Sequence, residues 1–139
     1  MNRRTLVQVL GLGLLTGFEL IEEAMASSET DKEGNRMIIV TVEVEFEDNQ
    51  IHEKRSAIQA MDEATAKEPG CLAYKSSFDA TNPNILRIYE MWESMDALKP
   101  HFATPHMAEF QAALSSLKAK GMDAKVYEVS KELPFPNQG

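Results

Sequence analysis

Apolar and polar residues alternate over residues 40–46, whose sequence is VTVEVEF. The even-numbered positions are apolar and the odd-numbered positions are polar or charged, which is the two-residue period of a strand with one face on a core. A charged segment follows, in which Asp48 or Asn49 can cap a helix and Pro69-Gly70 ends it. The pattern therefore predicts a strand and then a helix.

Two apolar segments after that helix predict a β-hairpin. They are CLAYKSSF, residues 71–78, and ILRIYEMWE, residues 85–93. The connection between them, DATNPN, is built from Asp, Asn and Pro, which favour turns. The spacing is that of two antiparallel neighbours.

The segment after the hairpin carries two helix-capping signals. Ser94 can cap a short helix, and Thr104 can cap a longer one with Pro105 at its first position, where a missing N–H has no consequence. The longer helix is expected to run to about Lys120 and to end at Gly121 as a left-handed C-cap. A last strand, MDAKVYEVS, follows it.

The order β-α-β-β-α-β is that of the ferredoxin-like α+β fold, an antiparallel sheet with helices on one face. In the strand over residues 85–93, the even-numbered positions from Leu86 to Trp92 share one face and the odd-numbered positions from Ile85 to Met91 share the other. Both faces carry bulky apolar residues, and the helices can cover only one. The other face is expected to pack on a second layer, supplied by a homodimer or by the N-terminal segment.

Residues 1–26 have the layout of an export signal. Arg3-Arg4 precede an apolar run from Leu6 to Phe18, and AMA supplies small residues before a candidate cleavage site at Ser27. The paired arginines resemble a twin-arginine signal, which predicts an exported, periplasmic protein. The alternative is a cytoplasmic protein whose N-terminal helix lies on the domain or on a partner. Residues 27–36 are polar and predict a linker in either case.

The composition describes one globular domain, over residues 37–130, with a proline-containing tail over residues 131–139. A formal net charge of −8 without any cluster of basic residues argues against nucleic acid as a partner. The single cysteine, Cys71, excludes an internal disulfide and a multi-cysteine metal site. No apolar stretch reaches the ~20 residues that a membrane-spanning helix needs.

The side chains with the most useful chemistry gather in one short segment. Residues 89–110 contain the only tryptophan and two of the three histidines. Glu90 and Trp92 share the strand face that looks toward the helices, and His101 lies in the turn between the helices. Glu90 can serve as an acid or base, or as a buried acceptor that fixes a histidine tautomer.

The last helix places a second histidine near the same space. His106 begins an apolar stripe that continues through Phe110, Ala113 and Leu117, so it is expected to point inward. A tryptophan, histidines and a carboxylate that converge among apolar groups describe a ligand site, whereas a histidine on an apolar stripe is also a common core residue. Tyr74 is a weaker candidate for the site. The third histidine, His52, is expected in solvent.

Three short motifs resemble the antibiotic biosynthesis monooxygenase family, which includes small quinol monooxygenases. They are EPGCLAY after the first helix, YEMWES at the third strand and HFATPHMAEF at the last helix. The resemblance implies a dimeric α+β barrel with a pocket between sheet and helices, and oxygenase members that use no metal, flavin or haem. It favours His106, His101 and Glu90 as catalytic residues and Trp92, Tyr74 and Phe110 as substrate-binding residues.

The absence of nucleotide-binding, hydrolase and metalloprotease motifs leaves acid–base chemistry as the interpretation. A histidine can remove a phenolic proton from a quinol near neutral pH, and the resulting anion can pass an electron to O₂ directly. We therefore expect a cofactor-independent monooxygenase acting on a small quinol or polyphenolic aromatic. A metal is not expected, because His101 and His106 lie on either side of a helix-capping proline rather than on one helix face.

Three alternatives stay open on the sequence. A non-oxidative isomerase of a small phosphorylated metabolite needs basic residues at the pocket, for which Arg87 and a few lysines are the candidates. Haem degradation needs a histidine ligand on the last helix, at a position that aligns with Gln111 here. A non-catalytic dimer that binds a small molecule in the same pocket is the third alternative.

Overall fold

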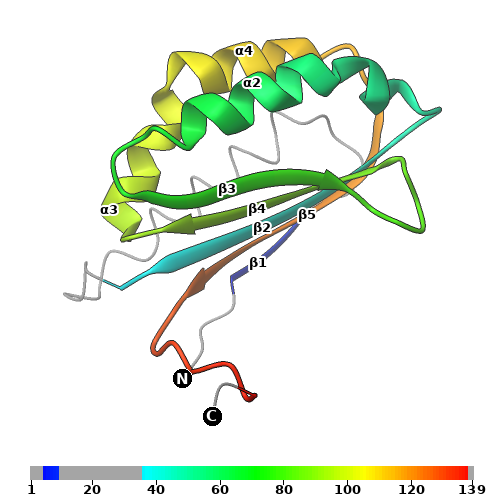
Figure 1. The fold of residues 1–139 in the computed structure, drawn as a ribbon. Coiled ribbons are helices and arrows are strands. Elements are labelled where there is room, and N and C mark those ends of the chain that lie inside the picture. Colours follow the sequence, from blue (N-terminus) through cyan, green and yellow to red (C-terminus); the bar gives the residue numbers. More distant parts are fainter. Residues whose placement is uncertain (1–4, 10–35, 138–139) are drawn as a thin grey trace.

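The structure, a computed structural model, is an antiparallel sheet with helices on one face (Figure 1). It describes residues 5–9 and 36–137. The strands are β1 (Thr5–Val9), β2 (Ile38–Phe46), β3 (Cys71–Phe78), β4 (Ile85–Trp92) and β5 (Ala119–Glu128). The helices are η1 (Gln50–Lys54), α2 (Arg55–Thr65), α3 (Met95–Leu98), η2 (Lys99–Ala103) and α4 (Pro105–Leu114).

The strands lie in the order β1-β5-β2-β4-β3, and every neighbouring pair is antiparallel. From β2 onward the chain order and the sheet order are those of the ferredoxin-like fold, which confirms the predicted fold class. The β3–β4 hairpin is also confirmed, with Tyr74 opposite Glu90. In Figure 1, α2 and α4 lie side by side over the same face of the sheet.

The core lies between that face and the two helices. All five even-numbered residues of β2, from Ile38 to Phe46, are at most 2% exposed, and β4 buries Leu86, Ile88, Glu90 and Trp92. This confirms the two strand faces predicted from the sequence. The helices contribute the residues that pack against them, namely Ile58 and Met61 from α2 and Met107, Phe110 and Leu114 from α4.

The opposite face of the sheet is not covered by the helices. On β4 it carries exposed Arg87 and Tyr89 between half-buried Ile85 and Met91. Arg87 forms ion pairs with Glu43 and, at 2.7 Å, with Asp79. Residues 5–9 form the strand β1 at the β5 edge, so this part of the N-terminal segment is neither a helix nor a layer over the open face. The rest of the expected signal, and all of the linker except Arg36, lie outside the described residues.

The last helix is shorter than predicted, because sheet pairing prevails over the glycine signal. The helix α4 ends at Leu114, and Gly121 lies inside β5 opposite Glu45 of β2. The prediction that Gly121 is a C-cap is therefore wrong. The strand β5 begins at Ala119, three residues earlier than the alternation in MDAKVYEVS suggested.

Of the predicted helix N-caps, two are confirmed and one is wrong. The hydroxyl of Ser94 accepts a hydrogen bond from the Ala97 N–H at 3.1 Å, and that of Thr104 accepts from the Met107 N–H at 3.3 Å. The chain instead enters η1 through Asp48 and Asn49 with positive φ angles of 55° and 57°, and Asn49 forms no side-chain cap. Short polar side chains tolerate this left-handed conformation.

The prediction that His52 is solvated holds only in part. Its side chain is half-buried, with Nε2 2.7 Å from the carbonyl oxygen of Pro83 and its ring 4.3 Å from that of Phe78. This contact holds η1 against the β3–β4 turn. Within the described residues, no helix combines the length and the apolar character needed to cross a membrane.

Candidate active site

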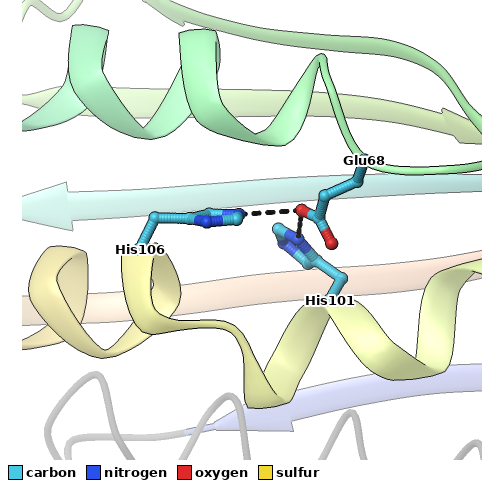
Figure 2. A group of neighbouring side chains, drawn as sticks. All are labelled: Glu68, His101 and His106. Atoms are coloured by element: carbon cyan, nitrogen blue, oxygen red, sulfur yellow. Dashed lines mark hydrogen bonds and ion pairs between the residues drawn. The ribbon is translucent and has the colours of Figure 1, made fainter.

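One carboxylate oxygen lies between two histidines beneath the helices. Oε2 of Glu68 is 2.6 Å from Nδ1 of His101 and 2.9 Å from Nε2 of His106 (Figure 2). The side chains are 11% exposed for Glu68, 0% for His101 and 21% for His106. The three residues come from three separate segments, so the fold is what brings them together.

A tight turn after α2 places Glu68. The backbone N–H of Glu68 donates to the Thr65 carbonyl at 2.9 Å, and the N–H of Cys71 donates to the Glu68 carbonyl at 3.1 Å. Gly70 completes the turn with a φ of +79°, and a Cβ atom at this position would lie 2.5 Å from Cβ of Ala97 in α3. Only glycine allows both this conformation and this close approach. The Pro-Gly pair that ends the helix in sequence therefore also aims the carboxylate.

Thr104 joins the two histidine segments. Its hydroxyl donates to the carbonyl oxygen of His101 at 2.7 Å, and the Thr104 hydroxyl oxygen accepts a hydrogen bond from the Met107 N–H at the start of α4. His101 lies in η2 and His106 in the first turn of α4. The cap thus fixes the bend between η2 and α4, and the bend lets both imidazoles reach one oxygen.

Three aromatic rings surround the imidazole of His101. The ring centroids lie 5.1 Å away for Trp92, 5.4 Å for Phe102 and 5.5 Å for Tyr74. Nε2 of His101 is buried and has no hydrogen-bond partner within the described part of the chain. Burial lowers the pKa of His101 below its ordinary value of 6.5, although the Glu68 carboxylate acts in the opposite direction. The imidazole is therefore neutral at pH 7.

A second buried carboxyl is hydrogen-bonded to Trp92. The indole N–H of Trp92 donates to Oε2 of Glu90 at 2.8 Å, and Glu90 is 4% exposed. Burial raises the pKa of Glu90 to about 7, partly offset by the Trp92 hydrogen bond and reinforced by the charge of Glu68. Burial likewise raises the pKa of Tyr74 well above 10.0, so Tyr74 remains a phenol.

The structure brings some of the predicted site residues together and separates others. His101, Tyr74 and Trp92 lie in one cluster, with His106 on its more exposed side. Glu90 accepts a hydrogen bond from Trp92 and lies opposite Tyr74 in the hairpin, and both of these residues have ring contacts with His101. Phe110 is 2% exposed within the core and takes no part in the ring contacts around His101. The buried side of α4 is Met107, Phe110 and Leu114, so Phe110 is buried as predicted, whereas His106 and Ala113 each lie one position before a buried residue.

The sequence interpretation missed Glu68 and Phe102. Glu68 lies in the motif EPGCLAY, but a glutamate beside a Pro-Gly turn has the appearance of a surface residue. The signal that could have identified Glu68 was its position immediately before the Pro69-Gly70 turn, where the glycine permits close packing against another element. Arg87, the basic residue that an isomerase would need, lies on the opposite face of the sheet in ion pairs.

Glu68, His101 and His106 also form a group that could hold a metal ion. One ligand atom from each lies within 4.8 Å of the others, so the capping proline does not keep the histidines apart as expected. Tetrahedral zinc spaces its nitrogen and oxygen ligands by ~3.3 Å, which follows from bonds of ~2.0 Å. The observed 2.6 and 2.9 Å are hydrogen-bond lengths. Binding through Nδ1 would also move the His101 proton to the buried Nε2, which has no acceptor, so the residues fit a hydrogen-bonded cluster better than a metal centre.

The sheet and the buried cluster place this chain in the ferredoxin-like α+β class, and comparison with known sequences places it in a family. Residues 37–113 match the antibiotic biosynthesis monooxygenase family. The chain belongs to that family. An uncharacterized protein from Synechocystis is 27% identical over 128 residues, which cover 92% of this chain and 86% of the relative.

Solved structures share the fold. A candidate antibiotic biosynthesis monooxygenase from Nitrosomonas europaea matches with a TM-score of 0.65 and 16% identity, over 72% of this chain and 96% of that one. Another from Deinococcus radiodurans matches with a TM-score of 0.64 and 24% identity, over 70% and 97%. A conserved protein from Bacteroides thetaiotaomicron, described as a candidate oxidoreductase, matches with a TM-score of 0.61 and 25% identity, over 68% and 99%.

Proposed function

We propose that this protein is a monooxygenase that oxidises a small quinol or polyphenolic aromatic with O₂, without a metal, flavin or haem. The observation that carries the proposal is the environment of His101. Its imidazole is neutral, is held through Nδ1 by a carboxylate, is surrounded by aromatic rings, and has a buried Nε2 that no described residue satisfies. A buried polar atom without a partner is rare and calls for an explanation, and a substrate hydroxyl supplies one.

The chemistry needs a base and an oriented ring. Transfer of a phenolic proton to a histidine leaves an electron-rich anion, which gives one electron to O₂ and forms a semiquinone and superoxide. Their recombination forms a carbon–oxygen bond, and loss of water gives a hydroxyquinone. The balance is one quinol and one O₂ consumed for one hydroxyquinone and one water formed. The protein supplies deprotonation and orientation, and the substrate supplies the electrons.

The aromatic side chains around His101 suit a flat substrate. Trp92 and Tyr74 offer ring faces and edges for stacking, and Tyr74 can also donate a hydrogen bond because it remains a phenol. Trp92 is 0% and Tyr74 3% exposed, whereas Phe102 is only partly buried. We therefore expect a substrate ring to reach His101 by displacing the Phe102 side chain. The substrate ring then occupies the space that Phe102 leaves.

Two further proposals concern the form in which the enzyme works. The uncovered face of β4, with exposed Tyr89 beside half-buried Met91, supports a homodimer in which two sheets pack face to face. The twin-arginine pattern and the AMA site support export of the chain after removal of residues 1–26.

Oxygen uptake tests the proposed activity. Purified protein should consume O₂ with a panel of hydroquinones, equally with and without EDTA. His101→Ala and His106→Ala should each lower the rate. His52→Gln is the matched control, because His52 contacts Phe78 at the far end of β3 and a glutamine amide can still donate to the Pro83 carbonyl.

Two results would contradict the proposal. An oxygen trace that flattens with EDTA would indicate a metal centre. Substrate binding without oxygen uptake, or histidine variants as fast as the wild type, would indicate a binding protein or a non-oxidative enzyme.

A further inference from the structure

We propose that Glu68 is a positioning residue that makes His101, and not His106, the base, and that an uncharged phenolic hydroxyl of the substrate donates its hydrogen bond to Nε2 of His101. This inference rests on the proposed function and deepens it, because it names the atom that takes the proton. It also assigns a role to a residue outside the predicted site.

The shared oxygen of Glu68 fixes which nitrogens carry protons. Oε2 lies within hydrogen-bond distance of His101 Nδ1 and His106 Nε2 at once. A protonated carboxyl oxygen could donate to one of these nitrogens and accept from the other, but a carboxyl group is ordinarily a stronger acid than an imidazolium, so the proton is expected on the ring nitrogen. An ionised carboxylate oxygen has lone pairs for two N–H donors. Glu68 therefore holds His101 in the Nδ1–H tautomer, which leaves the lone pair on Nε2.

The surroundings of the two histidines differ in the way that a base requires. The His101 side chain is 0% exposed and its Nε2 has no partner in the described residues, whereas the His106 side chain is 21% exposed. A buried acceptor without a donor lacks the hydrogen bond that water gave it in the unfolded chain, and a bound hydroxyl restores it. His106 is partly exposed to water, so it has no buried acceptor of this kind. Its N–H instead holds the Glu68 oxygen from the exposed side.

The carboxylate also stabilises the product of the proton transfer. When the phenol O–H bond breaks and the Nε2–H bond forms, His101 becomes an imidazolium whose Nδ1–H is 2.6 Å from the Glu68 oxygen. A hydrogen bond between two ions is shorter and stronger than one between neutral groups. The charge is therefore balanced within the cluster at the moment when the phenolate forms.

The charges around the cluster select the substrate. The titratable groups that face His101 are Glu68 from the turn after α2, His106 from α4 and Tyr74 from β3, while Glu90 of β4 is hydrogen-bonded to Trp92. Two of these groups are carboxyls and none is a lysine or arginine. A substrate with its own carboxylate or phosphate would meet repulsion here without a compensating cation. A neutral phenol would not.

Two Glu68 variants separate positioning from packing. Glu68→Gln keeps an oxygen that can accept from Nδ1–H but loses the charge, so kcat should fall roughly 10- to 100-fold with KM little changed. Glu68→Ala loses both, and kcat should fall about 100-fold or more, so that glutamine partly restores what alanine removes. Glu63→Gln is the matched control, since Glu63 is exposed on α2 and contacts only Gln59 among the described side chains. If Glu68 served only in packing, Glu68→Gln would retain the wild-type rate. That result would overturn the proposal.

Nitrogen-15 NMR of histidine-labelled protein tests the tautomer without using activity. In the wild type, Nδ1 of His101 should be protonated and Nε2 unprotonated at pH 7.5. Addition of 4-methylphenol should shift the Nε2 resonance of His101, and 4-hydroxybenzoate should do so far more weakly. A proton on Nε2 of His101, or a phenol-induced shift confined to His106, would overturn the inference.

The same spectra distinguish this inference from the proposed function. If no hydroquinone supports oxygen uptake but 4-methylphenol still shifts Nε2 of His101, the phenol site stands and the oxygenase proposal fails. If uptake occurs and the His101 tautomer is reversed, the oxygenase proposal stands and the role of Glu68 fails.

Discussion

Trp92 donates its indole N–H to Glu90 at 2.8 Å, across two residues of one strand and inside the core. It is the only donor that Glu90 has among the described side chains. A buried carboxylate is ordinarily held by several donors or by a cation, so Glu90 keeps a large part of the energetic penalty of its burial. The consequence is a carboxyl that titrates near neutral pH and links stability to pH.

Replacing Glu90 by glutamine should remove a pH-dependent loss of stability. The pKa of Glu90 is about 7 in the folded protein against an ordinary value of 4.5. Between these values the folded state holds a proton that the unfolded state has lost, so stability falls as pH rises through this window and levels off above pH 7. The difference of about 2.5 pKa units amounts to about 3 kcal/mol at most. Glu90→Gln should equal the wild type near pH 4 and exceed it by up to that amount at pH 8.

Urea unfolding at pH 4, 6 and 8 measures this difference between the two proteins, and subtraction cancels the other titrating groups that they share. The glutamine oxygen can still accept from Trp92, so packing is preserved. A constant difference across the three pH values would show that the pKa of Glu90 is the same in the folded and unfolded states, contrary to the effect expected from its burial.

The pH dependence of the rate should report the lowered pKa of His101. A base works in its unprotonated form, and burial moves the pKa of His101 below 6.5. The value of kcat/KM should therefore stay level from pH 8 down to pH 7 and fall only at a pH below 6.5. A half-maximal rate above pH 7 would mean that a different group, such as Glu90, is the one whose ionisation limits the reaction.

The strand faces could be predicted from sequence because a strand has only two. Once VTVEVEF fixed the period, the burial of Leu86, Ile88, Glu90 and Trp92 followed from the same alternation on the neighbouring strand. The helix was harder to predict, because a shift of one position changes which residues face the core. His106 consequently lies at the edge of the cluster, and Met107 is the residue that is buried.

Glu68 could not be predicted from local pattern for a different reason. It meets its partners 33 and 38 residues further along the chain, across a turn that depends on the contact between Gly70 and Ala97. Nothing in the residues around Glu68 encodes that distance. The prediction for Gly121 was wrong for the same reason. Its C-cap signal is local in the sequence, whereas the pairing of β5 with β2 depends on residues far apart in the chain.

A charge at Met91 should separate the proposed dimer. Met91 is half-buried on the uncovered face, and a second sheet against it would leave an aspartate there buried without a partner, which is strongly unfavourable. Sedimentation should give a dimer for the wild type and a monomer for Met91→Asp. The control is Ser116→Asp, which adds the same charge at an exposed position beyond α4. A wild type that sediments as a stable monomer would remove the basis for this interface.

The proposed export signal predicts a defined mature chain. Mass spectrometry of protein from its native host should find a first residue at or near Ser27. Removal at that point would also take away β1, whose residues Thr5–Val9 pair with β5, so the mature sheet would end at β5. Recovery of chains that begin at Met1 or Asn2 would instead favour β1 as a permanent edge strand.

The single tryptophan reports on the site directly. Trp92 is 0% exposed, so its fluorescence should be blue-shifted in the free protein, and a quinone stacked within ~4.5–7 Å of the indole should quench it. Trp92→Phe keeps most of the ring volume but leaves Glu90 without its donor, which should cost ~1–3 kcal/mol and weaken binding of the quinone. Trp92→Ala should cost ~3–5 kcal/mol of stability, because it also empties a buried volume.

In the Glu90→Gln background at pH 8, Trp92→Phe should cost less stability than in the wild type, because a neutral amide tolerates the loss of a donor better than a carboxylate does. The deciding measurement is a titration with a quinone against a saturated ring of similar size, corrected for absorption. Equal quenching by both rings, or by neither while activity persists, would place the substrate away from Trp92 and leave the indole as a packing residue that holds Glu90.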